Sequence, residues 1–328
     1  MKTPFTEQVG IEVPLICGAM YPCSNPELVA AASEAGAIGI IQPLSLVYVH
    51  GYDFRDGLKK IRSLTQKPVG INILVEKSTK IYEHRMREWL EIALEEGVRF
   101  VVTALGNPEW VVEKVHAKGG VVYHDVTERK WAEKALSKGV DGLICVNNRA
   151  GGHAGKLSPE ALYQDLKDLK VPLICAGGVG DENTFTEMIK IGYAGVQMGT
   201  RFIATEECHE KHNYKEAIVK AQEDDIVLTN RVTGIPLSVI KTPYVEAVGT
   251  DVGPVTRFLL QHRLTKHFMR LIIQVLSARK FKQTTLKGGS TKDYWQAGKS
   301  CQGIRSIESV SEIIDRFKKS LGNNPELR

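Results

Sequence analysis

Short apolar runs rich in β-branched residues recur along the first 200 residues of the chain, and polar segments separate them. Each run is almost continuously apolar, which is typical of strands that are buried on both faces of a parallel sheet. The pattern predicts eight strands, which begin near Pro14, Ala37, Pro68, Val98, Gly120, Val140, Val171 and Ala194.

The segments between these runs carry apolar residues at helical spacing, as in residues 107–118 (NPEWVVEKVHAK) and 128–138 (ERKWAEKALSK). Several of them end in glycine, which closes a helix readily. Eight strands alternating with helices predict an α/β fold of the (β/α)8 TIM barrel type. A doubly wound open sheet is the competing architecture, but the first strand lacks the GxGxxG that usually follows it in dinucleotide-binding folds.

This alternation stops after the eighth strand. Residues 206–281 have helical character without strand periodicity, and residues 284–303 read as a loop rich in Gly, Ser, Thr and Lys. Residues 307–321 (IESVSEIIDRFKKSL) then predict an amphipathic helix with acidic residues early and lysines late. We therefore predict three parts: a (β/α)8 barrel over 1–205, a mostly helical lid inserted after strand 8 over 206–283, and a return loop with the last barrel helix over 284–328.

Glycines cluster where the seventh and eighth strands end. Gly177 and Gly178 follow the seventh strand, and Gly199 and Thr200 follow the eighth. In TIM barrels these two loops often hold a phosphate, because missing side chains expose backbone N–H groups and a helix begins there. The alternative is that these glycines only permit tight turns. Because both loops carry the signal, we predict a phosphate site.

His153 stands in a loop of small residues, 151–155 (GGHAG), which leaves its imidazole accessible to a ligand. An ordinary histidine pKa near 6.5 suits proton transfer at neutral pH. His124, at the end of the fifth strand, is explained equally well by a structural hydrogen bond. Cys208, His209 and His212 resemble a metal cluster, but a solvated helix explains them better, and we predict no metal site.

Composition narrows the class of protein. Apolar residues make up 43% and charged residues 25%, which excludes bulk disorder. No apolar run is long enough to span a bilayer, and the N-terminus has no signal-peptide pattern. The 6 cysteines contain no CxxC pair, so we expect a cytoplasmic protein. The net charge of +5 is too small to indicate nucleic acid binding.

Five segments, taken together, carry a resemblance to a known family: 14–20 (PLICGAM), 151–155 (GGHAG), 176–178 (AGG), 196–202 (VQMGTRF) and 295–298 (WQAG). The sequence resembles the nitronate monooxygenase (2-nitropropane dioxygenase-like) family, which is related to enoyl-acyl carrier protein reductase II. This resemblance implies an FMN-binding barrel with a helical lid. It implies His153 as the catalytic residue and cofactor contacts from Ala19, Met20, Asn72, Gly152, Gly178, Gln197, Met198, Gly199 and Thr200.

The chain departs from many relatives at several positions. Asp125 stands where many nitronate-class members have lysine, and Asn147, Asn148 and Arg149 stand where relatives often have an acidic step. Ala154 follows the histidine where many relatives have Arg or Ile. We expect these positions to border the substrate rather than the phosphate.

The resemblance implies oxidation of alkyl nitronates or nitroalkanes with O2. The alternative is NAD(P)H-dependent reduction of a quinone or of an enoyl thioester on acyl carrier protein. Residues 257–287 support this alternative, because they hold 8 Lys and Arg and no Asp or Glu, although a solvated lid face would look the same. A third hypothesis is a non-catalytic, flavin-binding or membrane-associated protein that uses this basic segment, but the intact histidine loop argues against it.

Overall fold

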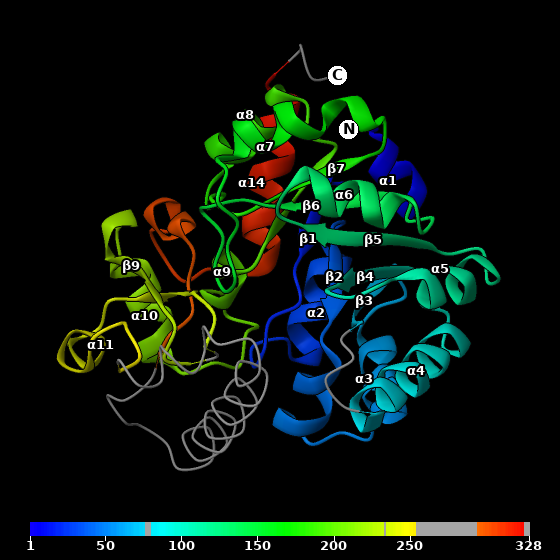
Figure 1. Cartoon of the computed structure of the whole chain (residues 1–328), viewed down its shortest axis with the longest axis horizontal. Coiled ribbons are helices and arrows are strands. Elements are labelled where there is room, and N and C mark those ends of the chain that lie inside the picture. The colour runs from blue at the N-terminus through cyan, green and yellow to red at the C-terminus, as the bar shows by residue number, and fades with distance from the viewer. Residues whose placement is uncertain (76–79, 233, 254–293, 325–328) are drawn as a thin grey trace.

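The computed structural model describes residues 1–75, 80–232, 234–253 and 294–324. Its centre is a closed barrel of eight parallel strands, in which each strand pairs with the next and β8 pairs with β1 (Figure 1). The predicted TIM barrel is thereby confirmed. The strands are β1 (Leu15–Cys17), β2 (Ile38–Ile41), β3 (Val69–Leu74), β4 (Phe100–Ala104), β5 (Val121–Val126), β6 (Gly142–Val146), β7 (Leu173–Ala176) and β8 (Gly195–Met198).

Helices between the strands surround the barrel (Figure 1). One further helix, α1 (Pro4–Val9), precedes β1. The connecting helices are α2 (Pro26–Glu34), α3 (Phe54–Leu64), α4 (Lys80–Glu95), α5 (Glu109–His116), α6 (Arg129–Leu136), α7 (Pro159–Leu166) and α8 (Glu182–Ile191). The short helix α9 (Thr200–Ile203) follows β8, and α14 (Val310–Gly322) packs against both α8 and α2. The chain thus returns to the barrel after a long excursion.

Aromatic side chains close the N-terminal end of the barrel interior. Phe100 and Tyr123 face inward from β4 and β5, and Phe5 of α1 packs against both rings, with centroids 5.8 and 5.6 Å away. Such buried rings contribute much of a core's stabilisation. The Tyr123 hydroxyl donates a 2.7 Å hydrogen bond to the Gln8 side chain. The polar atom of this aromatic group therefore has a hydrogen-bond partner.

The segment after β8 differs from the prediction, which had no strand there. It contains α10 (His212–Lys220), α11 (Pro243–Val248) and an antiparallel pair formed by β9 (Ile226–Thr229) and β10 (Leu237–Ile240). Each strand has only four residues, so the short apolar runs IVLT and LSVI could not be distinguished from helix by periodicity alone. The predicted helix over 257–282 lies outside the described residues, as does the first half, residues 284–293, of the predicted loop over 284–303.

No helix among the described residues has the length and apolar character that a bilayer crossing requires.

Candidate functional site

The loops at the C-terminal ends of β1 and β8 meet. A side-chain carbon placed on Gly199 would lie 3.2 Å from the Met20 sulfur, and the Gly18 N–H donates to the Met198 carbonyl at 2.9 Å. Gln197 occupies the inward-facing register of β8, whereas the Met198 side chain is buried in the layer between strands and helices. Of the predicted residues in β8, only Gln197 therefore turns its side chain toward the interior.

The glycines after β7 and β8 present free backbone donors. Neither the Gly178 nor the Gly199 amide N–H donates a hydrogen bond to any other described residue. Unpaired N–H groups at this edge of a barrel form an anion site when they converge. Thr200 is buried beside them, but its hydroxyl oxygen already accepts the Gly298 N–H at 2.9 Å.

The contribution of helix N-termini to this site stays a prediction, and the two helices offer little support for it. The first turn of α8 is capped by its own Asp181, whose carboxylate accepts the Thr184 N–H at 2.8 Å. The helix α9 has only four residues, which is too short for a useful macrodipole. The loop N–H groups of Gly178 and Gly199 are open donors whether or not a helix N-terminus contributes.

The loop after β6 folds over the loop after β7. The Asn147 side chain donates to the Gly177 carbonyl at 3.0 Å and accepts the Arg149 N–H at 2.8 Å. Gly178 has a φ of +86°, and a side-chain carbon there would lie 2.7 Å from the Arg149 Nε. Asn147 and Arg149 thus lie on the side of the predicted phosphate, which corrects the expectation that they border the substrate.

Arg149 also ties three distant segments together. Its guanidinium donates two hydrogen bonds to the Glu223 carboxylate, at 2.9 and 2.6 Å, and the Lys299 ammonium donates to the same carboxylate at 3.2 Å. Although desolvation opposes it, these bonds lower the pKa of Glu223. The cluster fastens the β6 loop to the segment after β8 and to the returning chain.

The β9–β10 pair holds the histidine loop. The Gly152 carbonyl accepts the Ser238 N–H at 2.8 Å, and His153 Nδ1 lies 3.1 Å from the Pro236 carbonyl oxygen. A carbonyl only accepts, so Nδ1 must carry the proton, and Nε2 of the neutral ring then has a free lone pair. The exposed imidazole is therefore oriented by a contact that sequence reasoning missed.

Two neighbouring residues of β5 point in opposite directions. His124 is buried outside the barrel, where its Nδ1 lies 2.8 Å from the Thr103 hydroxyl, and desolvation lowers its pKa to about 4. This placement favours the structural interpretation of His124. Asp125 takes the inward register, and one of its carboxylate oxygens, Oδ1, is buried without a hydrogen-bond partner among the described residues.

Asn72 is the third inward-facing polar residue at this end of the barrel. It is buried on β3, and among the described residues its amide makes only a long 3.4 Å hydrogen bond to the Val102 carbonyl. Its other hydrogen-bonding positions are therefore open to a ligand. Ala19 and Met20 follow β1 at the same edge and are partly buried.

The residues after α9 do not gather into a metal site. His209 Nε2 lies 3.7 Å from Glu27, His212 Nε2 lies 3.4 Å from Glu216, and Cys208 is buried near the Cys23 carbonyl. No group of three His, Cys, Asp or Glu side chains within the described part of the chain is arranged to bind a metal.

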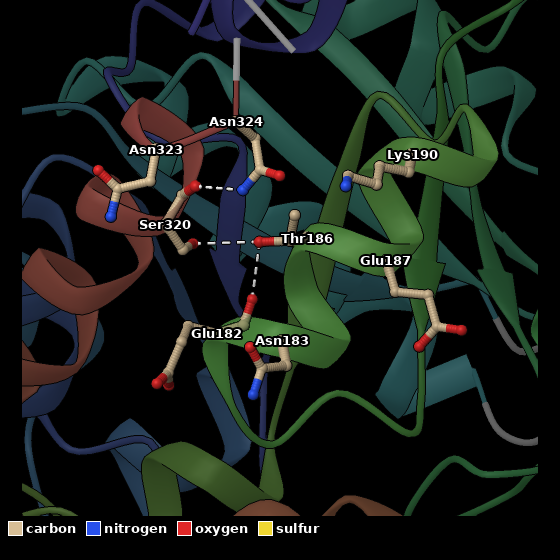
Figure 2. A pocket seen from close by; sticks show the side chains of 8 residues that line it. All are labelled: Glu182, Asn183, Thr186, Glu187, Lys190, Ser320, Asn323 and Asn324. Atoms are coloured by element: carbon tan, nitrogen blue, oxygen red, sulfur yellow. Dashed lines mark hydrogen bonds between the residues drawn. The ribbon is translucent and has the colours of Figure 1, made fainter. Parts of the chain in front are cut away.

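A polar depression of about 480 Å³ lies between α8 and α14, on the outer helical layer (Figure 2). Its side chains bond to one another: the Thr186 hydroxyl donates to the Glu182 carbonyl at 2.8 Å and lies 3.2 Å from the Ser320 hydroxyl. Both hydroxyls among its lining residues therefore already have partners, and the depression contains none of the predicted site residues. The candidate site is at the barrel end.

This fold and these loops define a (β/α)8-barrel protein with unpaired loop N–H groups and an oriented histidine at the C-terminal end of the barrel. The model of the nitronate monooxygenase family matches residues 2–319, and the chain belongs to that family. It is 28% identical, over 81% of its length and 86% of the relative, to a probable nitronate monooxygenase of Staphylococcus saprophyticus.

Two further relatives extend the comparison. A (3aS,4S,5R,7aS)-5-hydroxy-7a-methyl-1-oxo-octahydro-1H-indene-4-carboxyl-CoA dehydrogenase of Rhodococcus jostii is 30% identical, over 76% of this chain and 68% of that protein. The solved structure of FabK from Thermotoga maritima superimposes with a TM-score of 0.81 at 26% identity, covering 99% of this chain and 98% of FabK. Family and relatives together identify the chain as an oxidoreductase.

Proposed function

We propose that this protein is an FMN-dependent oxidoreductase that oxidises alkyl nitronates or nitroalkanes with O2. The observation that carries the proposal is the pairing of two features at one end of the barrel. Free N–H groups of Gly178 and Gly199 suit a phosphate, and His153 presents Nε2 as a base. Membership of the nitronate monooxygenase family supports the same reaction class.

The residues present fit a phosphate-bearing flavin. The N–H groups of Gly178 and Gly199 would hold the phosphate, with Gly177 and Thr200 shaping the turns around it. Ala19, Met20 and Asn72 would line the ring, Gln197 would face it from β8, and Gly152 would approach it from the histidine loop. The Met198 side chain takes no part in this arrangement, because it is buried in the outer core.

His153 has two roles open to it, depending on the form of the substrate. With a neutral nitroalkane, Nε2 would accept the proton from the carbon beside the nitro group. With the nitronate anion, a protonated ring would donate a hydrogen bond to a nitro oxygen. In both cases the Pro236 carbonyl holds the ring through Nδ1. When bound, FMN would supply the redox chemistry, accepting electrons from the nitronate and passing them to O2.

Anaerobic mixing of the purified yellow protein with a propyl-2-nitronate, NADH or NADPH tests this proposal. We expect the nitronate to bleach the flavin absorbance within the mixing time and both nicotinamides to leave it unchanged. Re-admission of O2 should restore the absorbance and release carbonyl product. Bleaching by a nicotinamide alone would contradict the proposal.

The second candidate function is redox chemistry on an acyl thioester, linked to NAD(P)H. A specific observation favours it: the relative at 30% identity is a CoA-thioester dehydrogenase. The basic segment 257–287 would attract the phosphates of coenzyme A or an acidic acyl carrier protein, although it lies outside the described residues. Flavin bleaching by NADPH, with re-oxidation by an enoyl thioester but not by O2, would establish this candidate.

All six cysteines are free thiols, which supports a reducing, cytoplasmic location for either reaction.

A further inference from the structure

Asp125 is the last inward-facing residue of β5. Side chains alternate along a strand, and Tyr123, two residues earlier, packs inside the barrel. Asp125 therefore faces the same interior, one step closer to the C-terminal end, where its backbone pairs with Ile144 of β6. It shares this end with the inward-facing amides of Asn72 and Gln197.

The carboxyl of Asp125 is unusual because one of its oxygens is buried without a partner among the described residues, although the residue as a whole is only partly buried. Its Oδ1 is buried and unpartnered among the described residues, and burial raises the pKa of Asp125 to about 7. Residues 100–104 of β4 carry no ionisable side chain. On β6 the titratable neighbour is the buried Cys145 thiol, whose pKa is raised chiefly by desolvation and also by Asp125.

A buried carboxyl oxygen without a partner is costly unless a ligand completes its hydrogen bonds. The missing partner must suit a neutral acid, which offers one O–H donor and one carbonyl acceptor side by side. A lactam edge, C=O beside N–H, matches both groups at once, and the pyrimidine half of a flavin ring has such an edge. An alkyl nitronate offers acceptors only, so it would bind the O–H of the acid and leave its carbonyl oxygen without a donor.

We propose that Asp125 is a flavin-positioning residue, which pairs as a neutral carboxylic acid with the lactam edge of the isoalloxazine ring. This assignment rests on the proposed function, because it requires a bound flavin. Asn72 and Gln197 add uncharged amides on the inward-facing registers of β3 and β8, at the same end of the barrel. Ionisation of Asp125 would remove the donor and place a negative charge against a carbonyl oxygen.

The test is the dissociation constant of FMN, measured by quenching of flavin fluorescence from pH 6 to pH 8.5. In the wild type we expect affinity to fall about tenfold or more across this range, as Asp125 loses its proton. Asp125→Asn keeps a donor and an acceptor in nearly the same shape, so its affinity should stay close to the low-pH wild-type value. Because the FMN phosphate and His153 are common to both proteins, the ratio of the two constants isolates Asp125.

A second variant, Asp125→Leu, removes both hydrogen bonds. We expect it to bind FMN at least tenfold more weakly than Asp125→Asn at every pH, while the melting temperature of its flavin-free form equals or exceeds that of the wild type, since a buried unpaired carboxyl is lost. Equal pH profiles in wild type and Asp125→Asn, or wild-type affinity that rises with pH, would overturn the assignment. Tight FMN binding with such a flat profile would leave the proposed function standing, whereas absence of any flavin binding would overturn both.

Discussion

At the N-terminal end of the barrel interior, Phe5, Phe100 and Tyr123 pack against one another, and the single phenol donates to Gln8. At the C-terminal end, the Asp125 carboxylate and the N–H groups of Gly178 and Gly199 lack partners among the described residues. The first end is complete as a folded protein, and the second requires a ligand. Changes at the two ends should therefore affect stability and function separately.

The largest expected effect separates function from stability at the C-terminal end. His153→Ala removes the base while leaving the loop glycines, so nitronate turnover should fall by about 10²- to 10⁴-fold. Because the imidazole is exposed, the melting temperature and the bound FMN should stay unchanged. His84→Ala, an exposed histidine of α4, is the matched control and should retain full turnover. Undiminished turnover in His153→Ala would remove this residue from the mechanism.

The opposite result is expected at the aromatic end. Phe100→Ala opens a cavity between Phe5 and Tyr123, and the free energy of unfolding should fall by about 3–5 kcal/mol in denaturant titrations. Trp131 is an aromatic residue with 42% of its surface exposed, so Trp131→Ala should lower the free energy of unfolding much less. FMN affinity and kcat of the folded Phe100→Ala protein should match the wild type. A selective loss of kcat would contradict the separation of the two ends.

Local patterns explain why the barrel and the histidine loop could be predicted. Each strand is an apolar run bounded by polar segments, and the loop of small residues around His153 is visible in the sequence itself. The contact of β10 with the histidine loop could not be predicted, because it joins Ser238 to Gly152, far away along the chain. The position of Arg149 likewise depends on Glu223, 74 residues later.

Asp125 shows a subtler difficulty. The strand VVYHDV carries apolar residues on both faces, so its inward side cannot be assigned until the barrel closes and Tyr123 is found in the interior. Both His124 and Asp125 looked like candidates for chemistry in the sequence, yet one faces the helices and the other faces the barrel end. The pairing of strands, rather than composition, decides between them.

A smaller effect is expected from the glycine turns. Gly178→Ala forces an alanine into a φ of +86° and displaces the Arg149 side chain. The turn geometry that exposes the N–H groups should then be about 1–2 kcal/mol less favourable. FMN should bind roughly 5- to 30-fold more weakly, whereas riboflavin, which lacks the phosphate, should bind as before. Gly97→Ala is the control, because its φ of +83° imposes the same strain at the N-terminal end of β4 with open space around it. Equal losses for FMN and riboflavin would place the phosphate elsewhere.

The smallest predicted effect concerns a charge at the C-terminal end that already has partners. Arg201 is buried, donates to the Ala204 and Ser306 carbonyls at 2.7 and 2.8 Å, and lies 3.3 Å from Glu308. Glu308→Gln should lower the free energy of unfolding at pH 7 by about 1 kcal/mol, because the amide still accepts a hydrogen bond but no longer offsets the buried charge. Turnover should not change.

The pH dependence of that difference follows from the charge. Hydrogen bonds from Arg316, and the nearby Arg201, hold the pKa of Glu308 below its ordinary value of 4.5 in the folded protein. A lowered carboxylate pKa stabilises the protein above the unfolded-state value, and this contribution is lost as pH falls through the folded-state pKa. The wild type and Glu308→Gln should therefore converge in stability below pH 4.5 and differ fully at neutral pH. If the stabilities of the two proteins converged as the pH is raised, or if Glu308→Gln lost turnover at pH 7, Glu308 would serve ligand binding rather than the stability of the fold.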